Sequence, residues 1–220
     1  MKRLFADRAA AGREVAAAFA QHVGRKDVLV LGLPRGGVPV AYEVARSLAA
    51  PLDVLVVRKL GLPGHEELAI GAIASGGVRV LNDRVVSGLG VGGAVVEAVA
   101  ERELLELKRQ ERFYRDDRGP LPVAGRNTVA VDDGLATGAT MRAAVMALRR
   151  RGARSITVAV PISSRRSCAE IAELVDDVVC AHTPERFLAV GAWYRDFGQV
   201  SDEDVRHLLE QAREAATTGR

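Results

Sequence analysis

The segment 129–140 reads VAVDDGLATGAT and decides the fold. An apolar run ends in two carboxylates, Asp132 and Asp133, and a loop of small residues then leads into a helical pattern. Unpaired backbone N–H groups and the helix dipole favour a phosphate at a helix N-terminus, and the two threonines of the loop add hydroxyl donors. Gly138 lets the backbone approach such an anion closely. We therefore expect a strand, an anion-binding loop and a helix, with the two acids facing sugar hydroxyls or a hydrated Mg²⁺.

An ordinary strand–turn–helix corner is the alternative for this segment. Asp-Gly turn chemistry explains Gly134 and one of the two aspartates. It does not explain two adjacent acids followed by Thr-Gly-Ala-Thr. We therefore favour a ligand site.

Apolar runs elsewhere in the chain extend this interpretation to a whole sheet. They are apolar throughout rather than alternating, which is typical of strands buried on both faces of a parallel sheet. Helical patterns at about 39–49, 139–151 and 167–174 separate them, so the chain is predicted to form a doubly wound parallel α/β sheet. We expect strands at Asp27–Leu33, Asp53–Val57, Thr128–Val131, Ser155–Ile162 and Val178–Ala181.

Two segments interrupt this rhythm. Residues 58–82 carry several glycines and a Pro-Gly pair, which indicates loops. Residues 95–116 have acids and bases at helical spacings, which suggests a solvated surface helix rather than a nucleic-acid site. We also expect an N-terminal helix at about 8–22 and a capped helix from Ser201 onward.

Residues 88–93 formally match the GxGxxG pattern and precede the long charged helix. A dinucleotide site needs a strand soon after its helix, with an acid at the strand's tip. Here the charged helix continues for most of the next two dozen residues instead. We interpret the glycines as a loop that enters this helix.

A second glycine-containing turn follows the first predicted strand. Residues 31–39 read LGLPRGGVP and open a helix. Adjacent glycines expose backbone N–H groups to an anion, and Arg35 adds a cation with bidentate geometry. A tight strand-to-helix turn would account for the glycines alone. The case for an anion site therefore depends on finding this motif and the 129–140 motif in this order along the chain.

Arg58 and Lys59 follow the second predicted strand and enter the glycine-rich segment. They are candidates to bind a second anion. A solvated pair at a strand end is the competing interpretation. His65, Glu66 and Glu67 lie in the same segment, and the sequence assigns them no role.

These motifs, in this order, resemble the type I phosphoribosyltransferase family, and the resemblance covers about 28–197. It implies a parallel sheet with a flexible flap at about 58–82 and a small C-terminal hood. We therefore expect a single domain over 1–220. Its core would lie at about 24–183, and its hood and final helix at about 184–216.

The resemblance also implies a task for each motif. Asp132 and Asp133 would hold the ribose hydroxyls of 5-phosphoribosyl-1-pyrophosphate (PRPP) and face Mg²⁺, directly or through water. Together with Arg58 they are the implied catalytic residues. The 5′-phosphate would bind at Ala136, Thr137, Gly138, Ala139 and Thr140. The pyrophosphate would bind at Pro34, Arg35, Gly36, Gly37, Arg58 and Lys59.

Residues 187–197 are rich in aromatics and are similar to the hood of the purine-salvage members. By that resemblance Trp193, Tyr194 or Phe197 would stack on a planar base, and Asp196 would contact metal or substrate. Packing of the C-terminal segment on the core explains any one of these aromatics equally well.

Two departures from the family pattern leave the acceptor base open. Ala136 stands where the hypoxanthine-guanine enzymes carry an acid, and in this the loop resembles adenine-type members. The flap also lacks the serine-tyrosine pair of the hypoxanthine-guanine group. The identity of the base is therefore not implied.

The composition of the chain weighs against several other functional classes. The chain has 31 basic and 28 acidic residues, a smaller excess of charge than in a dedicated nucleic-acid binder. Aromatics make up 4%, which weighs against a stacking platform for single strands. Apolar runs are too short to cross a bilayer, and the first residues lack a secretory signal pattern. We expect a cytoplasmic protein with no membrane or nucleic-acid partner.

The two cysteines, Cys168 and Cys180, show no CxxC or zinc-type spacing. A disulfide-based scaffold is excluded for a chain of this size and composition. We expect buried, reduced thiols.

The implied reaction is displacement of pyrophosphate from C1 of PRPP by a ring nitrogen of a base, with Mg²⁺ as cofactor. Its transition state resembles an oxocarbenium ion, so the protein acts mostly by electrostatic positioning. The alternatives are a non-catalytic PRPP-sensing regulator or an RNA-binding protein on the same fold, and, third, hydrolysis or phosphorolysis of a phosphoribosyl compound. Retention of the pyrophosphate loop favours the transferase. Dimers are common in the family, and the oligomeric state stays open.

Overall fold

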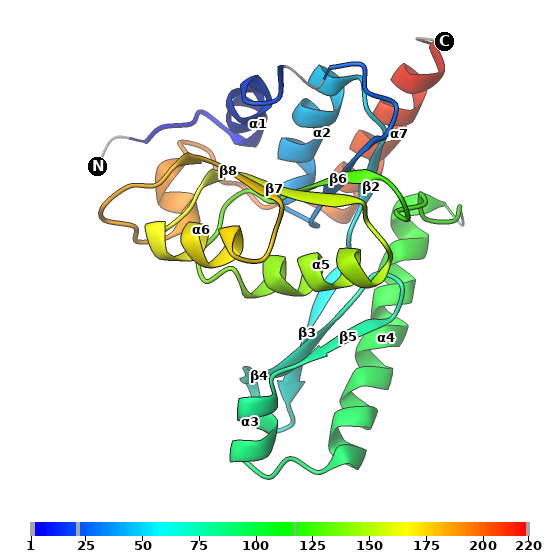
Figure 1. Cartoon of the computed structure of the whole chain (residues 1–220), viewed down its shortest axis with the longest axis vertical. Coiled ribbons are helices and arrows are strands. Elements are labelled where there is room, and N and C mark those ends of the chain that lie inside the picture. The colour runs from blue at the N-terminus through cyan, green and yellow to red at the C-terminus, as the bar shows by residue number, and fades with distance from the viewer. Residues whose placement is uncertain (1–2, 21–22, 117, 219–220) are drawn as a thin grey trace.

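A five-stranded parallel sheet forms the centre of the molecule (Figure 1). The computed structural model describes residues 3–20, 23–116 and 118–218. The strand order is β2-β1-β6-β7-β8, which confirms the predicted doubly wound parallel sheet. Its strands are β1 (Val28–Gly32), β2 (Leu52–Val54), β6 (Asn127–Val131), β7 (Ser155–Ile162) and β8 (Asp177–His182).

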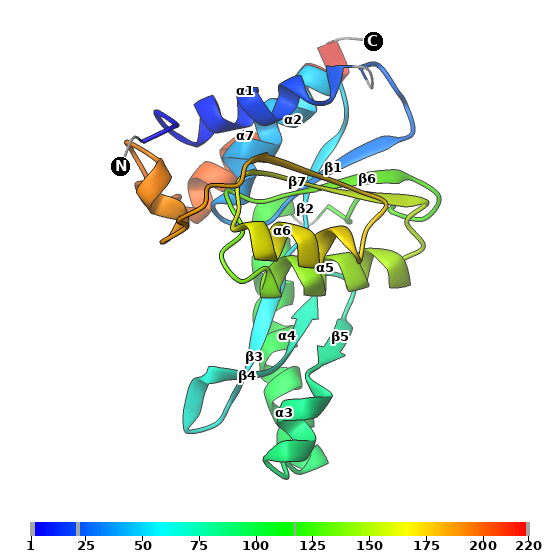
Figure 2. The same cartoon turned by 60° about the vertical axis from the view of Figure 1, so that its left-hand side comes forward.

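Helices cover both faces of this sheet, as Figures 1 and 2 show. Three helices lie on one face: α1 (Arg8–Ala17), α2 (Gly37–Leu48) and α7 (Asp202–Thr218). Two lie on the other: α5 (Ala139–Arg150) and α6 (Arg165–Ala172).

Strand β1 shows why the strand runs are apolar throughout. All five of its residues are buried. Val28 and Val30 pack in the hydrophobic cluster on the α2 side, whereas Leu29 and Leu31 pack with the helices of the opposite face. Successive side chains of a strand point to opposite faces, so a strand covered on both sides has no polar position.

A second, three-stranded antiparallel sheet projects from the core (Figure 1). The prediction of loops over 58–82 is wrong, because this segment forms strands. The long helix α4, predicted at 95–116, runs along this sheet and joins it to the core. The elements of this projection are β3 (Val57–Leu62), β4 (His65–Ala74), β5 (Val78–Leu81), α3 (Asp83–Gly88) and α4 (Gly93–Arg115).

Two of the glycines that suggested loops, Gly61 and Gly71, lie inside these strands. A Cβ on Gly61 would stand 2.6 Å from the Glu66 carbonyl oxygen, and one on Gly71 would overlap the Val80 carbonyl oxygen. Glycine is therefore required by the close approach of neighbouring strands, next to an irregularity in the pairing of β3 with β4. Gly64 and Gly76, both with positive φ, sit in the hairpin turns.

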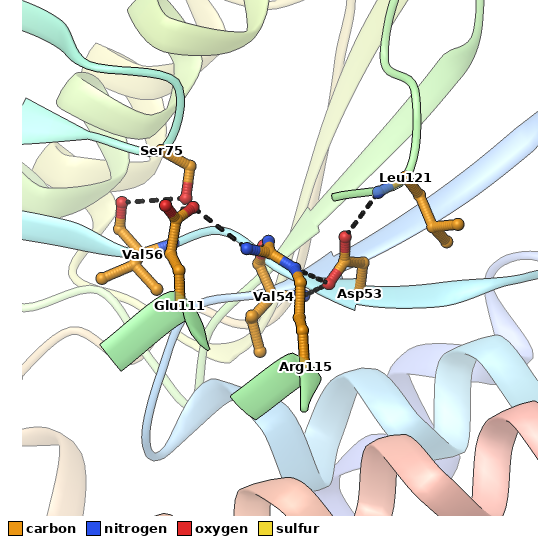
Figure 3. A network of polar contacts seen from close by, with 7 residues as sticks. All are labelled: Asp53, Val54, Val56, Ser75, Glu111, Arg115 and Leu121. Atoms are coloured by element: carbon orange, nitrogen blue, oxygen red, sulfur yellow. Dashed lines mark hydrogen bonds and ion pairs between the residues drawn. The ribbon is translucent and has the colours of Figure 1, made fainter. Parts of the chain in front are cut away.

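A buried polar network fastens the projection to the core (Figure 3). Arg115, the last residue of α4, donates from Nε to Asp53 Oδ1 at 2.8 Å and from Nη2 to the Val54 carbonyl oxygen at 2.8 Å. The other Asp53 oxygen accepts from the backbone N–H of Leu121 at 2.9 Å. Glu111, one turn earlier in the helix, adds a second carboxylate at 3.1 Å. The network thus joins β2, the end of α4 and the segment that follows it.

The two terminal helices follow their predicted positions in part. Helix α1 ends at Ala17, and residues 21–22 of the predicted helix, including His22, lie outside the described residues. Ser201 caps α7 as expected: its Oγ accepts from the Asp204 backbone N–H at 3.0 Å, and its own N–H donates to the Asp204 carboxylate at 2.9 Å.

Cys168 and Cys180 form a disulfide that ties α6 to β8. The expectation of reduced thiols is therefore wrong. Helix α6 returns antiparallel to its neighbouring strand and brings the two Cα atoms to 6.7 Å, within bridging distance. Their separation of 12 residues in the sequence gave no sign of this proximity.

Within the described part of the chain, none of the helices combines the length and the apolar character needed to cross a membrane. The long helix α4 carries charged residues along its exposed side.

Replacing Arg115 by Met should lower the free energy of unfolding by about 3 kcal/mol, because it leaves the buried Asp53 carboxylate without its main counter-charge. The side chains of this pair are only 5% and 8% exposed. Urea unfolding of the purified chain measures the change. Arg109→Met is the matched control on the same helix: that arginine is 62% exposed and pairs with Glu106. Its loss should cost much less stability than the loss of Arg115, because solvent screens an exposed ion pair. Equal effects of the two substitutions would contradict the fastening role.

Candidate functional site

The carboxyl ends of β1 and β6 lie side by side, because Gly32 pairs with Val131 in the parallel ladder. From β1 the chain crosses over by α2 to β2 on one side, and from β6 it crosses by α5 to β7 on the other. The order of strands reverses between β1 and β6, and such a switch point is where open α/β sheets bind ligands. Both predicted anion loops, 33–37 and 132–140, begin at this point.

Two acidic side chains occupy the centre of the switch point. Asp132 Oδ1 accepts from the Asp133 backbone N–H at 2.8 Å, and Asp133 Oδ2 accepts from Arg8 Nε at 2.8 Å. Burial raises the pKa of the Asp132 carboxyl well above its usual range, and the charge of Asp133 adds to this. Burial also raises the pKa of Asp133, against the lowering effect of Arg8. Hydroxyl donors or a cation beside these two carboxylates would therefore stabilise their charged forms.

The start of α2 packs directly on this acidic pair. A Cβ on Gly37 would lie 2.6 Å from the Val131 carbonyl oxygen and 2.8 Å from Asp132 Cα. A Cβ on Gly36 would overlap the Asp133 carboxylate. Both glycines are needed for this close approach rather than for unusual dihedral angles. The structure thus brings the predicted pyrophosphate turn against the predicted ribose-binding acids.

The rest of the turn between β1 and α2 is more exposed. The peptide bond between Pro34 and Arg35 is cis. The Arg35 side chain is 43% exposed, and its Nη1 lies 4.0 Å from Asp202 Oδ1 at the start of α7. Asp202 also accepts a hydrogen bond from the Tyr114 hydroxyl at 2.6 Å. Arg35 therefore stands at the rim of the site with its guanidinium largely in solvent.

The loop before α5 enters the helix at Gly138, and its predicted role as a phosphate site stays a prediction. Gly138 precedes the helix with φ +69°, a conformation that favours glycine, and Ile171 of α6 packs against it. The Ala136 carbonyl oxygen accepts from Ser167 Oγ at 2.6 Å, so α6 supports the loop from behind. Exposed residues frame the free N–H groups of the first helical turn: Ala136, Thr137, Ala139 and Thr140.

Arg58 and Lys59 lie on β3, in the projection. Arg58 turns to α4, where its Nε donates to Glu103 Oε2 at 2.7 Å and its Nη1 to Gln110 Oε1 at 3.4 Å. Lys59 is exposed. Their predicted role at a pyrophosphate stays a prediction, and in this structure the helix holds Arg58.

The aromatic residues after β8 divide into buried and exposed members. Tyr194 is 1% exposed and donates its hydroxyl to the Asp133 carbonyl oxygen at 2.6 Å. Burial raises the pKa of this hydroxyl, which therefore stays a donor. Trp193 is buried with Phe5 and Ile162. Phe197, at 37% exposure, is the most accessible of the three predicted stacking residues.

Asp196 is exposed and accepts from the Gly198 backbone N–H at 2.9 Å. It shapes the turn that follows the aromatics. The stacking and metal roles predicted for residues 193–197 stay predictions.

Arg8 is a residue of the site that the sequence analysis missed. It lies in the first turn of α1, and its guanidinium reaches Asp133, the Gly198 carbonyl oxygen and the face of the Phe197 ring. An arginine in an alanine-rich helix carries no sequence signal for such a contact. Only the fold brings it to the acids.

The donor set fits a magnesium ion that arrives with its ligand. In the part of the chain that the structure describes, no group of three His, Cys, Asp or Glu side chains converges on one point. Mg²⁺ often binds proteins through one or two carboxylates and takes its remaining ligands from phosphates and water. Asp132 and Asp133 supply such hard oxygens next to an anion loop.

Comparison with known proteins identifies the family. The phosphoribosyl transferase domain profile matches residues 4–191. The chain is 52% identical over 218 residues to "Putative phosphoribosyl transferase Rv0571c" of Mycobacterium tuberculosis, which covers 99% of this chain and 49% of that protein. The chain thus spans about half the length of the curated relatives it matches. It is also 28% identical over 179 residues to a uracil phosphoribosyltransferase of Lactobacillus gasseri, covering 76% of this chain and 80% of that protein.

Solved structures agree with the fold. The protein TT1426 from Thermus thermophilus is 42% identical, with a TM-score of 0.82 over 94% of this chain and 98% of that chain. A hypothetical protein from Neisseria gonorrhoeae with bound ppGpp shares 13% identity and a TM-score of 0.50 over 100% of this chain and 99% of that chain, a likeness of fold alone. Because the family profile spans most of the sequence and the identity to a named relative is high, the chain belongs to the phosphoribosyltransferase family.

Proposed function

We propose that this chain transfers the 5-phosphoribosyl group of PRPP to a nitrogenous base and releases pyrophosphate, in a Mg²⁺-dependent reaction. The observation that carries the proposal is the meeting of three parts at one switch point: the Asp132–Asp133 pair, the loop before α5 and the Gly36-Gly37 turn. PRPP has a ribose between a 5′-phosphate and a 1-pyrophosphate. One diol site between two anion sites matches that order of groups.

Each part has a task that its geometry supports. The first turn of α5 offers N–H groups and the hydroxyls of Thr137 and Thr140 to the 5′-phosphate. The two acids would accept from the ribose hydroxyls. In the turn before α2 the Gly37 N–H already donates to the Leu33 carbonyl oxygen, so the N–H groups of Arg35 and Gly36 would bind the pyrophosphate. Arg35, at the rim, would offer the leaving group a partly exposed cation, which in this structure lies 4.0 Å from Asp202.

The proposed transfer requires mainly that the protein position the reacting groups and stabilise the charges that develop on them. As the bond to pyrophosphate breaks, positive charge develops on the ribose ring and negative charge on the leaving oxygens. Buried carboxylates stabilise the ring, and backbone N–H groups with Arg35 stabilise the pyrophosphate. When bound, Mg²⁺ would supply further charge neutralisation on the pyrophosphate oxygens, held by Asp132 and Asp133. The projection formed by β3, β4, β5 and α4 is the element that would exclude water from the site.

Calorimetric titration of Mg²⁺ and PRPP, repeated with a panel of nucleobases, tests the proposal. Binding that turns into pyrophosphate release with one base would confirm the transferase and name its acceptor. Binding without turnover for any base would instead support a PRPP sensor. Absence of PRPP binding would overturn the proposal.

Changing both Asp132 and Asp133 to Asn should weaken PRPP binding by more than about a hundredfold, since hydrogen bonds to charged groups contribute about 1.5–3 kcal/mol each. Calorimetry at fixed Mg²⁺ concentration measures this loss. The matched control is Asp177→Asn, at the amino end of β8 and so at the opposite edge of the sheet. It should bind PRPP as the unaltered chain does. Undiminished affinity in the double variant would show that the ribose binds elsewhere.

Gly37→Ala should weaken binding of Mg²⁺-pyrophosphate by about tenfold or more, because a Cβ there must push the start of α2 away from β6. Gly93→Ala is its counterpart, since each glycine is the first residue of its helix. A Cβ on Gly93 meets no atom within 4 Å. Thermal unfolding checks that both variants fold. If the two alanines affect pyrophosphate binding alike, the turn before α2 is not the anion site.

A further inference from the structure

Arg8 connects three segments of the site that are distant in sequence. Its Nε donates to Asp133 Oδ2 at 2.8 Å, and its Nη1 donates to the Gly198 carbonyl oxygen at 2.8 Å. The centre of its guanidinium lies 3.9 Å from the centroid of the Phe197 ring. Arg8 also lies against the turn before α2, because a Cβ on Gly36 would stand 3.3 Å from its Nε.

These contacts hold the guanidinium in one place. The Arg8 side chain is 12% exposed and the Asp133 side chain 15%, so the ion pair is shielded from solvent. Two hydrogen bonds and a cation–π contact act on one planar group, and each restricts it in a different direction. Asp7 starts helix α1 one residue earlier by accepting from the Ala10 backbone N–H at 2.7 Å. Helix and side chain together thus fix the position of the charge.

The ion pair also gives the two oxygens of the Asp133 carboxylate different surroundings. Arg8 binds Oδ2, and among the described residues no donor reaches Oδ1. A carboxylate anchored through one oxygen presents the other in a defined direction. The positive charge of Arg8 further reduces the repulsion between Asp133 and its neighbour Asp132. Both effects prepare the acidic pair for a ligand that brings hydroxyl donors.

We propose that Arg8 is a positioning residue for ribose binding: it orients Asp133 toward a hydroxyl of the sugar and holds the 197–198 segment of the hood against the site. This inference rests on the proposed binding of PRPP. It predicts that the effect of Arg8 on PRPP affinity passes through Asp133.

The experiment is a double-mutant cycle, with the affinity for PRPP at fixed Mg²⁺ measured by calorimetry. Arg8→Met should weaken binding by about tenfold or more, the usual range for loss of a hydrogen bond to a charged group. Arg8→Lys keeps the charge but cannot reach Asp133 and Gly198 together, so it should fall between Met and the unaltered chain. In an Asp133→Asn background, Arg8→Met should add less than about twofold, because the coupled partner is already gone.

Arg13→Met is the matched control on the same helix. Arg13 is 56% exposed and pairs with Glu43 of α2, away from the acids. Its replacement should leave PRPP affinity unchanged. Circular dichroism and thermal unfolding establish that each variant folds, and if Arg8→Met does not, Arg8→Lys alone and in the Asp133→Asn background completes the cycle.

The outcomes separate the possibilities. An equal loss from Arg8→Met with and without Asp133 would overturn the inference, since a purely structural role acts in both backgrounds. Tighter PRPP binding by Arg8→Met would also overturn it, because the guanidinium would then occupy the ribose site. Unchanged affinity in every Arg8 variant would refute the inference and leave the proposed function standing. No PRPP binding by the unaltered chain would refute both.

Discussion

The arrangement of the molecule depends on one buried ion pair, Arg115 with Asp53. The parallel sheet holds its own strands together, but the projection of β3, β4, β5 and α4 enters and leaves the core at adjacent points. Arg115 holds the end of α4 against the end of β2, where the chain returns to the core. A buried carboxylate or a buried guanidinium without a partner lowers the stability of the fold. Separating the two side chains is therefore unfavourable. The pair therefore fixes where the projection stands relative to the switch point.

The parallel core could be predicted from sequence because burial on both faces leaves a simple mark, an apolar run without alternation. The strand-to-helix turns within 129–140 and 31–39 could also be placed, since glycine and small residues stand there between an apolar run and a helical pattern. The anion-binding role of these turns stays a prediction. The projection could not be predicted, for a related reason. Gly61 and Gly71 permit close contacts between strands, and in the sequence they look the same as glycines in turns. Local pattern does not distinguish these two uses of glycine.

The partners of individual side chains could not be predicted from the sequence. The Cys168–Cys180 bridge depends on how α6 lies against β8. The contact of Arg58 on β3 with Glu103 of α4 depends on the path of the whole projection. Tyr194 has the residue type of a stacking aromatic, yet its buried hydroxyl supports the backbone of Asp133. In each case the residue type was informative and its partner was not, because a partner is set by the fold rather than by spacing.

The contacts of Arg8 have a consequence for the order in which the site matures during synthesis. Its partners follow it by 125 and 190 residues, and the backbone N–H groups of Leu4 and Phe5 donate to the Trp193 carbonyl oxygen. Helix α1 leaves the ribosome before the other elements of the site, and its contacts with 193–198 can form only after those residues are made. The strands of the sheet can pair as they emerge, and Arg8 can meet Asp133 once that residue is made, but the contacts of Tyr194 and Gly198 with this centre form only later. A nascent chain that has not reached residue 198 therefore carries the proposed phosphate loop without the complete set of contacts around the proposed sugar site.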